Sequence, residues 1–340
     1  MTIMKDITFV VPCYNSQDYM KRCIDSLLFC KERGEIIIVD DGSTDATGEI
    51  ADAYERLYPD IVRVIHKSNG GHGSGVNAGL KLASGRFFKV VDSDDWLDGK
   101  ALEALLACLK EWEDRLDLVV CNYIYDHLYE NKQKRVSFRN VFPEGKRCGW
   151  QDMKPLLPSQ YLVMHALVFR TAVLRQSDVV LPEHTFYVDN LFAYKPLPRV
   201  HHIYYLNEDL YHYFLGRDDQ SVNENSYMKR IDQQIRVTKL VAECADLQEI
   251  YRTSPRLAKY MVRNISIMLS ISSIYLLMIK SQEALEKRED LWNYIRQKDE
   301  WLYKKLKYQC LSGFTYLPGT FGSTLTLKGY EIAKRTYQFS

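Results

Sequence analysis

The chain has 340 residues, of which 46% are hydrophobic and 26% charged, and its formal net charge is +1. It is too long for one minimal domain, its composition is ordinary for a soluble globular protein, and its near-neutral total gives no indication of nucleic-acid binding. The charge is nevertheless uneven, because residues 1–225 carry 26 basic and 33 acidic side chains whereas residues 226–340 carry 19 and 11.

Short apolar runs alternate with helical periods in the first hundred residues. The predicted strands are 7–11, 35–39, 62–65 and 86–91, and the predicted helices are 16–30, 44–57 and one that ends at Leu82 after a glycine-rich loop at 69–75. This alternation predicts a parallel sheet with crossover connections. Ligands of such sheets bind outside the carboxyl ends of the strands, where the polar segments 12–15, 40–41 and 92–94 are expected to converge.

The rest of the chain changes character twice. A helix at 101–112 and a strand at 116–123 are predicted first, then an irregular basic region to about residue 150, and a mixed region that includes the aromatic run 203–214. From 226 to about 309 glycine is absent and apolar residues recur at helical spacing, which predicts three or four helices. The tail 311–340 is predicted to be a short helix with loops.

The eight cysteines form no CxxC pair and no Cys/His cluster at zinc spacing. Because the N-terminus also shows no secretory signal pattern, we expect reduced thiols in a cytoplasmic protein. The stretch 262–279 is apolar but contains Arg263, Asn264 and four serines. It is therefore predicted to be a core or interfacial helix rather than a membrane span.

Two carboxylates, Asp92 and Asp94, flank Ser93 directly after an apolar strand. They are placed to share a hard divalent cation such as Mg²⁺ or Mn²⁺, with phosphate oxygens and water completing the octahedron. Asp-rich turns are also common after strands, because Asp favours turns and helix caps. Asp95 is an equal candidate for the cap of the next helix.

Two further segments are suited to a nucleotide. The carboxylates of VDDGSTD (39–45) are suited to hydrogen-bond ribose hydroxyls or a uracil N–H group. Four glycines in six residues (70–75) favour a backbone that approaches a ligand with N–H groups facing phosphate, although glycine content alone also fits a flexible surface loop. Neither segment has the GxGxxG spacing or the Walker lysine, which disfavours a redox or P-loop enzyme.

The order PCYN (12–15), VDDGSTD (39–45), NGGHGSGVNAG (69–79) and DSDD (92–95) resembles the N-terminal half of family 2 glycosyltransferases. The resemblance covers residues 5–100 nearly continuously. It implies the α/β GT-A fold, in which helices flank a Rossmann-like, mostly parallel sheet. It also implies an enzyme of bacterial cell-surface glycan synthesis that uses a UDP-sugar donor and a glycan, wall or capsule polymer, or glycoprotein acceptor.

The resemblance divides the chain and assigns roles to its residues. The catalytic domain would be 1–225, with a nucleotide-binding half at 1–100 and an acceptor half at 101–225, followed by a helical C-terminal domain at 226–340. Donor and nucleotide contacts are implied for Pro12, Tyr14, Asn15, Asp41, Lys67, Asn69, Gly71, Asn77, Asp92 and Ser93. A Mn²⁺ or Mg²⁺ ion would be bound by Asp94 as the principal ligand, together with Asp92 and His212.

Family 2 members also have a catalytic base in the second half of the domain. The segment TFYVDNLF (185–192) resembles that element and makes Asp189 the candidate base, although Val188 stands where an acidic neighbour is common. Inversion needs one carboxylate to deprotonate the acceptor hydroxyl while that oxygen attacks the anomeric carbon opposite the leaving diphosphate. As an alternative, Asp189 would only cap a helix.

The segment 211–222 resembles an arginine- and serine-bearing stretch that follows the base in many bacterial relatives. Arg217 is expected to contact the diphosphate and offset charge on the departing UDP, or else to pair with a neighbouring aspartate. His212 is expected to join the metal ligands, or else to pack among aromatic rings. His165 and Arg170 are expected to border the acceptor pocket.

The C-terminal helices match no motif. Their apolar stripe (227–241) indicates a core, and an exposed remainder would suit homo-oligomerisation or a peripheral position at the inner face of the cell membrane. Two other function classes stay open. A sugar-nucleotide nucleotidyltransferase is disfavoured because the 12–15 segment is not a basic, glycine-rich loop, and a catalytically silent scaffold or partner subunit is disfavoured by the intact Asp92, Asp94 and Asp189.

Overall fold

The computed structural model describes residues 5–127, 132–158, 160–216 and 224–337. The chain divides into two compact units, residues 1–218 and 219–340. The division falls a few residues before the predicted boundary at 226. Each unit is described by itself.

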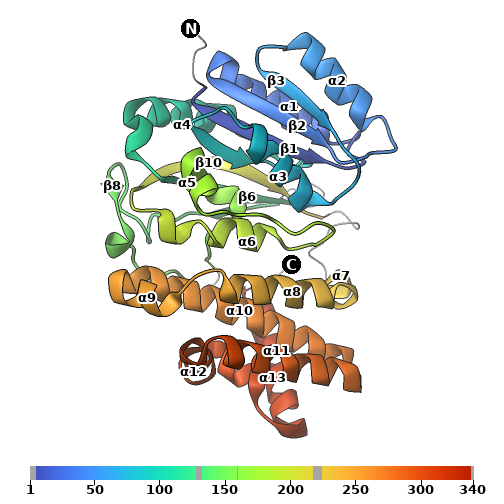
Figure 1. Cartoon of the computed structure of the whole chain (residues 1–340), viewed down its shortest axis with the longest axis vertical. Helices are drawn as coiled ribbons and strands as arrows, with labels where there is room; N and C mark the ends of the chain where they lie inside the picture. Colours follow the sequence, from blue (N-terminus) through green and yellow to red (C-terminus); the bar gives the residue numbers. More distant parts are fainter. Residues whose placement is uncertain (1–4, 128–131, 159, 217–223, 338–340) are drawn as a thin grey trace. The chain divides into compact units, whose positions relative to one another are not determined.

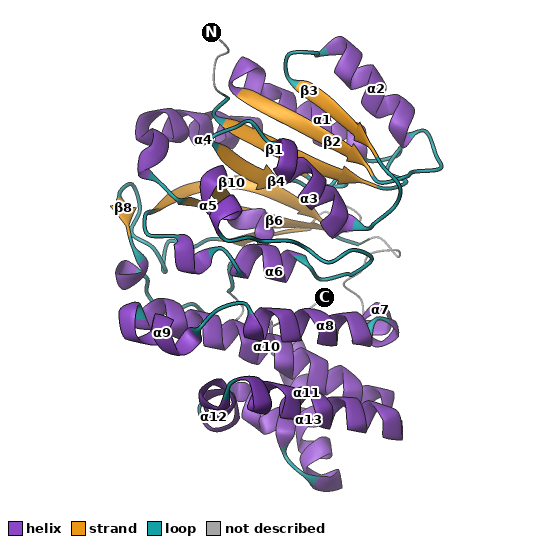
Figure 2. Cartoon of the chain, viewed as in Figure 1, coloured by secondary structure: helices purple, strands orange, loops and turns teal. Residues whose placement is uncertain are grey.

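The first hundred residues form a parallel sheet, as predicted. Its strands run in the order β3-β2-β1-β4, every neighbouring pair is parallel, and the bounds are β1 Ile7–Cys13, β2 Gly34–Asp40, β3 Val62–His66 and β4 Phe87–Val90. All seven residues of β1 are buried, which is the pattern of a strand covered on both faces. Figure 2 shows these strands with helices on either side.

The rest of the sheet is mixed. Its strands are β9 (Leu167–Arg170), β6 (Leu118–His127), β10 (Ile203–Phe214), β5 (Trp96–Leu97), β7 (Lys132–Val136) and β8 (Arg147–Cys148). The short strand β9 lies antiparallel between β4 and β6, while β10 is parallel to β6 and antiparallel to β5 and β8. The predicted aromatic run thus forms one strand, β10, which supplies the second half of the sheet with its longest element (Figure 1).

The helices of this unit are α1 (Met20–Leu27), α2 (Thr47–Leu57), α3 (His72–Leu82), α4 (Gly99–Trp112), α5 (Thr171–Gln176) and α6 (Asp189–Tyr194). Two expectations are corrected. The glycine-rich segment is mostly helix, because α3 starts at His72 and packs so closely on β1 that a Cβ at Gly79 would overlap Val10. The cap of α4 is Asp98, which accepts the Ala101 N–H at 2.9 Å, and not Asp95.

The second unit is helical. Its helices are α7 (Glu224–Lys229), α8 (Ile231–Glu243), α9 (Leu247–Thr253), α10 (Pro255–Ile279), α11 (Gln282–Lys298), α12 (Glu300–Tyr308) and α13 (Gly319–Tyr337). More helices occur than the three or four predicted, because Asp246, Ser281 and Asp299 start new helices by side-chain capping without glycine at the breaks. The tail holds a 19-residue helix instead of a short one.

The central helix of this unit is α10, which packs against α8, α9 and α11. In the described part of the chain it is the one helix long and apolar enough to cross a membrane, and 61% of its most apolar 18-residue window is buried inside the protein. Burial of this kind is what a core helix of a helical bundle shows.

Candidate active site

The candidate site lies at the carboxyl ends of the parallel strands. The loop Asp92–Asp95 leaves β4 and runs into β5, whose Trp96 is the register partner of His212 on β10. The sheet therefore brings His212 to the end of the DSDD loop, although more than a hundred residues separate them in sequence. Ser93 joins the loop to the first motif through a 2.8 Å hydrogen bond with Ser16.

Asp92 lies between two histidines. His72 Nε2 lies 2.8 Å from one carboxylate oxygen, and His165 Nε2 lies 3.5 Å from the other. Burial opposes ionisation of Asp92, but the two histidines outweigh it and hold the pKa of Asp92 well below its usual range. Burial also opposes protonation of His72, yet Asp92 and Asp189 raise the pKa of His72. The site thus holds Asp92 ionised.

Asp95 is the buried member of the loop and has no exposed surface. One of its oxygens accepts the Tyr211 O–H group and the other accepts the Phe214 N–H group at 2.8 Å. Burial and the neighbouring Asp94 and Asp92 raise the pKa of Asp95 well above its usual range. The loop therefore holds two carboxyl groups three residues apart, Asp92 with a lowered pKa and Asp95 with a raised pKa.

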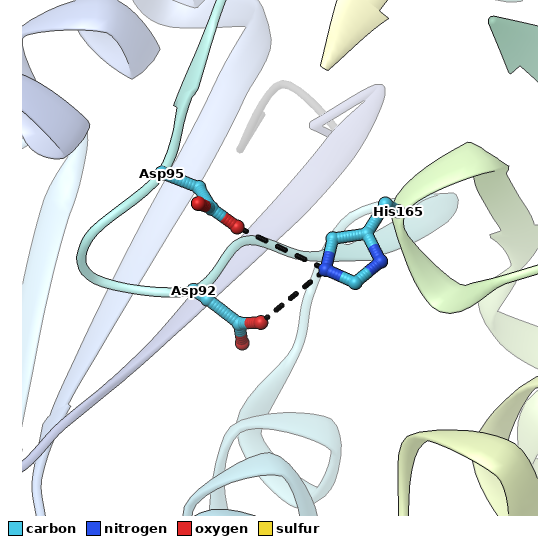
Figure 3. A group of neighbouring side chains, drawn as sticks. All are labelled: Asp92, Asp95 and His165. Atoms are coloured by element: carbon cyan, nitrogen blue, oxygen red, sulfur yellow. Dashed lines mark ion pairs between the residues drawn. The ribbon is translucent and has the colours of Figure 1, made fainter. Parts of the chain in front are cut away.

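A group of side chains that could bind a cation is present, and it shares only Asp92 with the expected ligands. Among the described residues, Asp92, Asp95 and His165 have ligand atoms within 4.8 Å of one another (Figure 3). His165 Nε2 is buried without a hydrogen-bond partner, since Asp92 and Asp95 lie at 3.5 and 3.8 Å. Carboxylate oxygens with one imidazole nitrogen fit Mn²⁺ or Mg²⁺ by ligand type.

The expected ligands Asp94 and His212 are not members of that group. His212 Nδ1 lies 3.2 Å from the buried carboxylate of Asp126, and the His212 ring stacks on Trp96 at 5.0 Å. When Nδ1 donates to a carboxylate, Nε2 keeps its lone pair, and this is the arrangement that metal-binding histidines usually have. The backbone oxygen of Asp94 accepts a hydrogen bond from Arg22 at 3.0 Å.

Asp189 lies near the same histidines. It is the first residue of α6, is half-buried, and follows Val188, which occupies the cap position of that helix. Burial raises the pKa of Asp189, while His165 and His72 favour its ionised form and offset part of the rise. A carboxylate with a raised pKa beside the DSDD loop has the properties of a general base.

The motif residues of the nucleotide half mostly bond to one another. The buried Asp41 carboxylate accepts Lys67 Nζ at 2.6 Å and the N–H groups of Gly70 and Gly71, and its backbone oxygen accepts Asn69 Nδ2 at 2.9 Å. These bonds fix the loop after β2 and the start of the glycine-rich segment against each other.

The other residues expected to contact the nucleotide lie in different surroundings. Tyr14 is 54% exposed, and Asn15, at φ 49°, accepts the Thr44 N–H at 2.9 Å, so both lie at the surface after β1. Pro12 lies beneath Gly75, where a Cβ would come within 3.1 Å of it. Both polar groups of Asn77 are bonded to the backbone of Leu181.

One expectation about arginines changes, and one is not tested. Arg170 pairs with Asp117 at 2.7 Å and is the register partner of Phe87, the first residue of β4, so it lies at the opposite end of the strand from Asp92. It therefore does not border the same pocket as the DSDD loop. Arg217 lies outside the described residues.

Sequence reasoning missed three side chains at this site. The sequence places His72 only in a glycine-rich loop, Asp95 only in a turn or helix cap, and His165 only beside the acceptor. A polar residue inside a glycine-rich segment was the available signal for His72. Nothing in the sequence indicates that His165 faces Asp92, because that contact depends on the antiparallel insertion of β9.

Comparison with known proteins identifies similar chains. Residues 8–174 match the family described as Glycosyl transferase family 2. The poly(ribitol-phosphate) beta-N-acetylglucosaminyltransferase TarS of Staphylococcus aureus (strain Mu50) is 28% identical over 271 residues, which is 77% of this chain and 45% of TarS. The uncharacterized glycosyltransferase EpsJ of Bacillus subtilis (strain 168) is 30% identical over 245 residues, covering 67% of this chain and 66% of EpsJ.

The fold has a solved counterpart. The crystal structure of S. aureus TarS 1-349 in complex with UDP-GlcNAc has a TM-score of 0.65 and 19% identity, and the match covers 98% of this chain and 91% of that one. The chain spans about half the length of the full TarS protein. The motif order, the sheet topology and these matches agree, and the chain belongs to glycosyl transferase family 2, with a first unit of the GT-A fold.

Proposed function

We propose that the chain is an inverting glycosyltransferase that moves a sugar from a UDP-sugar to an acceptor hydroxyl, with a divalent cation at the DSDD loop and Asp189 as the base. The observation that carries this proposal is that His72 and His165 contact Asp92 at the carboxyl end of β4 and also favour the ionised form of Asp189, which comes from a distant segment. Ligands of parallel sheets bind at this edge, and the chain's family consists of sugar transferases.

In this proposal Asp189 takes the proton of the acceptor hydroxyl while that oxygen attacks the anomeric carbon from the face opposite UDP. The raised pKa of Asp189 makes it a stronger base than an ordinary aspartate, and His72 and His165 favour its ionised form before the reaction. The ionised Asp92, held by His72, is placed to accept hydrogen bonds from the donor. A bound cation would neutralise charge that develops on the leaving diphosphate.

We assign the cation to Asp94, Asp92 and His212. The support is the Asp126–His212 pair, which directs Nε2 of His212 away from Asp126, and the register that brings His212 beside the loop. The alternative donors Asp92, Asp95 and His165 fit less well, because both Asp95 oxygens already accept hydrogen bonds in a fully buried position. A cation there would have to displace the Tyr211 O–H and Phe214 N–H groups.

The names of the relatives narrow the choice of donor and acceptor. TarS is named for transfer of N-acetylglucosamine to poly(ribitol-phosphate), and its solved fragment holds UDP-GlcNAc. We therefore propose a UDP-hexose or UDP-N-acetylhexosamine donor and a bacterial cell-surface polymer, glycan or glycoprotein as acceptor. The proposed location is the cytoplasm, at the inner face of the membrane, where the basic second unit would face anionic lipid. Homo-oligomerisation is the other use proposed for its helices.

The test is calorimetric titration with UDP in the presence and absence of Mn²⁺. We expect tight binding that needs Mn²⁺, a large loss in Asp94→Asn, and no change in the control Asp60→Asn, an exposed aspartate far from the loop in sequence. UDP release from a panel of UDP-sugars then identifies the donor. Equal UDP affinity without Mn²⁺ would contradict the role of the cation, and a native chain that binds no UDP would revive the scaffold and nucleotidyltransferase alternatives.

A further inference from the structure

The segment that leads into Asp189 is fastened to α3 by side-chain and backbone hydrogen bonds. Asn77 Nδ2 donates to the Leu181 carbonyl at 2.8 Å, and Asn77 Oδ1 accepts the Leu181 N–H at 3.0 Å. Three residues later the His184 N–H donates to the Gly70 carbonyl at 2.6 Å. One asparagine therefore satisfies both backbone groups of a loop residue, and the orientation of its amide follows from one donor and one acceptor partner.

The glycines of the same element leave room for this segment. A Cβ at Gly73 would come within 2.8 Å of the Leu181 Cβ and 3.3 Å of Val188. Gly71, at φ 84°, lies where a Cβ would meet the His184 backbone at 3.3 Å. The glycine-rich sequence is thus used to seat the loop 181–188 against α3, with Val188 directly before Asp189.

The loop keeps an unfavourable backbone. His184 and Tyr187 have φ values of 48° and 66°, a region that residues with a side chain rarely adopt. Such conformations persist only where the surrounding structure holds them, and they concentrate at functional sites. The hydrogen bonds of Leu181 with Asn77 and of the His184 N–H group with the Gly70 carbonyl are constraints of this kind, because they fix the backbone on the N-terminal side of both residues.

We propose that Asn77 is a positioning residue for the base: it holds the loop 181–188 on α3 and thereby sets the place of Asp189 relative to Asp92. The inference rests on the proposed role of Asp189 and replaces the expected role of Asn77 as a nucleotide contact. Both polar groups of Asn77 are engaged by Leu181, which leaves the backbone loop and not the donor as its partner. Small misplacements of a reacting group lower turnover strongly, while ligand affinity depends on other contacts.

The test compares Asn77→Ala with Lys81→Ala, an exposed residue on the same helix. Turnover is measured as UDP release with the donor that the native chain accepts, and UDP affinity by titration with Mn²⁺. We expect kcat to fall about 10- to 100-fold in Asn77→Ala, with UDP affinity within about twofold of native. Hydrogen exchange at the Leu181 and His184 amides should become faster, because their protection depends on this fastening.

A second variant keeps the polar groups and moves the loop. Gly73→Ala should favour the helix while its methyl group displaces Leu181, so kcat should fall with UDP affinity kept, even if Asn77→Ala folds poorly. A loss of UDP affinity of tenfold or more in Asn77→Ala with kcat unchanged would show a nucleotide contact and overturn the inference.

Asp189→Asn separates this inference from the function on which it rests. If Asp189→Asn is inactive but Asn77→Ala and Gly73→Ala turn over normally, the positioning role is wrong and the base stands. If Asp189→Asn keeps native turnover, the proposed base itself is wrong. If Asp189→Asn and Asn77→Ala both lose turnover, the double variant should turn over little more slowly than Asp189→Asn alone, since the two residues would act through one group.

Discussion

A buried lysine beneath the active-site loop gives a prediction whose size follows from the structure. Lys89 lies on β4, has no exposed surface, and donates to the His165 carbonyl at 2.6 Å. Burial lowers the pKa of Lys89 from 10.5 to about 8, and the nearby Asp92 and Asp95 offset only part of that effect. The lysine therefore destabilises the fold at neutral pH in exchange for holding His165 in place.

The pH dependence of stability follows from the pKa of Lys89 in the folded and in the unfolded chain. At pH 7 Lys89 is charged in both, and the depressed folded-state pKa corresponds to a cost of about 3 kcal/mol. As the pH rises from about 8 to 10.5 the folded chain loses this proton before the unfolded chain does, so stability is regained. Between pH 7 and pH 9 the regain is about 1 kcal/mol.

Lys89→Met removes this titration. The free energy of unfolding should be equal to that of the native chain or up to about 2 kcal/mol larger at pH 7, because the relief of about 3 kcal/mol is reduced by leaving the His165 carbonyl without its donor. The advantage should shrink by about 1 kcal/mol between pH 7 and pH 9. Activity should fall because His165 loses its support.

Urea titrations in EDTA, followed by circular dichroism at both pH values, provide the measurement. Lys110→Met, an exposed lysine of α4, is the control and should change little. Parallel changes with pH in Lys89→Met and the native chain would refute the depressed pKa. A variant less stable than native by more than about 2 kcal/mol at pH 7 would show that the hydrogen bonds of Lys89 outweigh its burial.

Three further predictions concern residues around the DSDD loop. Asp126→Asn should weaken Mn²⁺ binding in the presence of UDP about 10- to 100-fold by releasing His212, and unchanged affinity in titrations would contradict the metal assignment. Tyr211→Phe should lower the free energy of unfolding by about 2 kcal/mol, because the buried Asp95 loses a donor; a urea midpoint equal to native would speak against this. Turnover should fall with decreasing pH through the raised pKa of Asp189, above the ordinary 3.8 of an aspartate, so a pH–rate profile that is flat down to pH 4 would exclude Asp189 as the base.

Much of the first unit could be predicted from periodicity. The strands at the start of the chain are short apolar runs that alternate with helical periods, and the aromatic run 203–214 coincides with β10. The insertion of β9 between β4 and β6 could not be predicted, because four residues show no usable period and the pairing depends on contacts distant in sequence. In the second unit the absence of glycine from 226 to about 309 predicts too few helix breaks, because the polar caps Asp246, Ser281 and Asp299 start new helices there.

The site was predictable where it coincides with strand ends. Asp92 and Asp94 follow β4 directly, and the rule for parallel sheets places them at the ligand edge. The partners of Asp92 were not predictable, since His72 and His165 reach it from α3 and from the turn before β9. Asn77 was assigned to the nucleotide by its motif, whereas its hydrogen bonds go to a loop that lies far along the chain.

The most direct test of the account is UDP release from a panel of UDP-sugars, with and without Mn²⁺, by the native chain and by Asp189→Asn. We predict turnover with one donor that needs Mn²⁺ and is lost in Asp189→Asn, while that variant still binds UDP with native affinity. Native turnover by Asp189→Asn, or no binding of UDP by the native chain, would contradict the proposed mechanism.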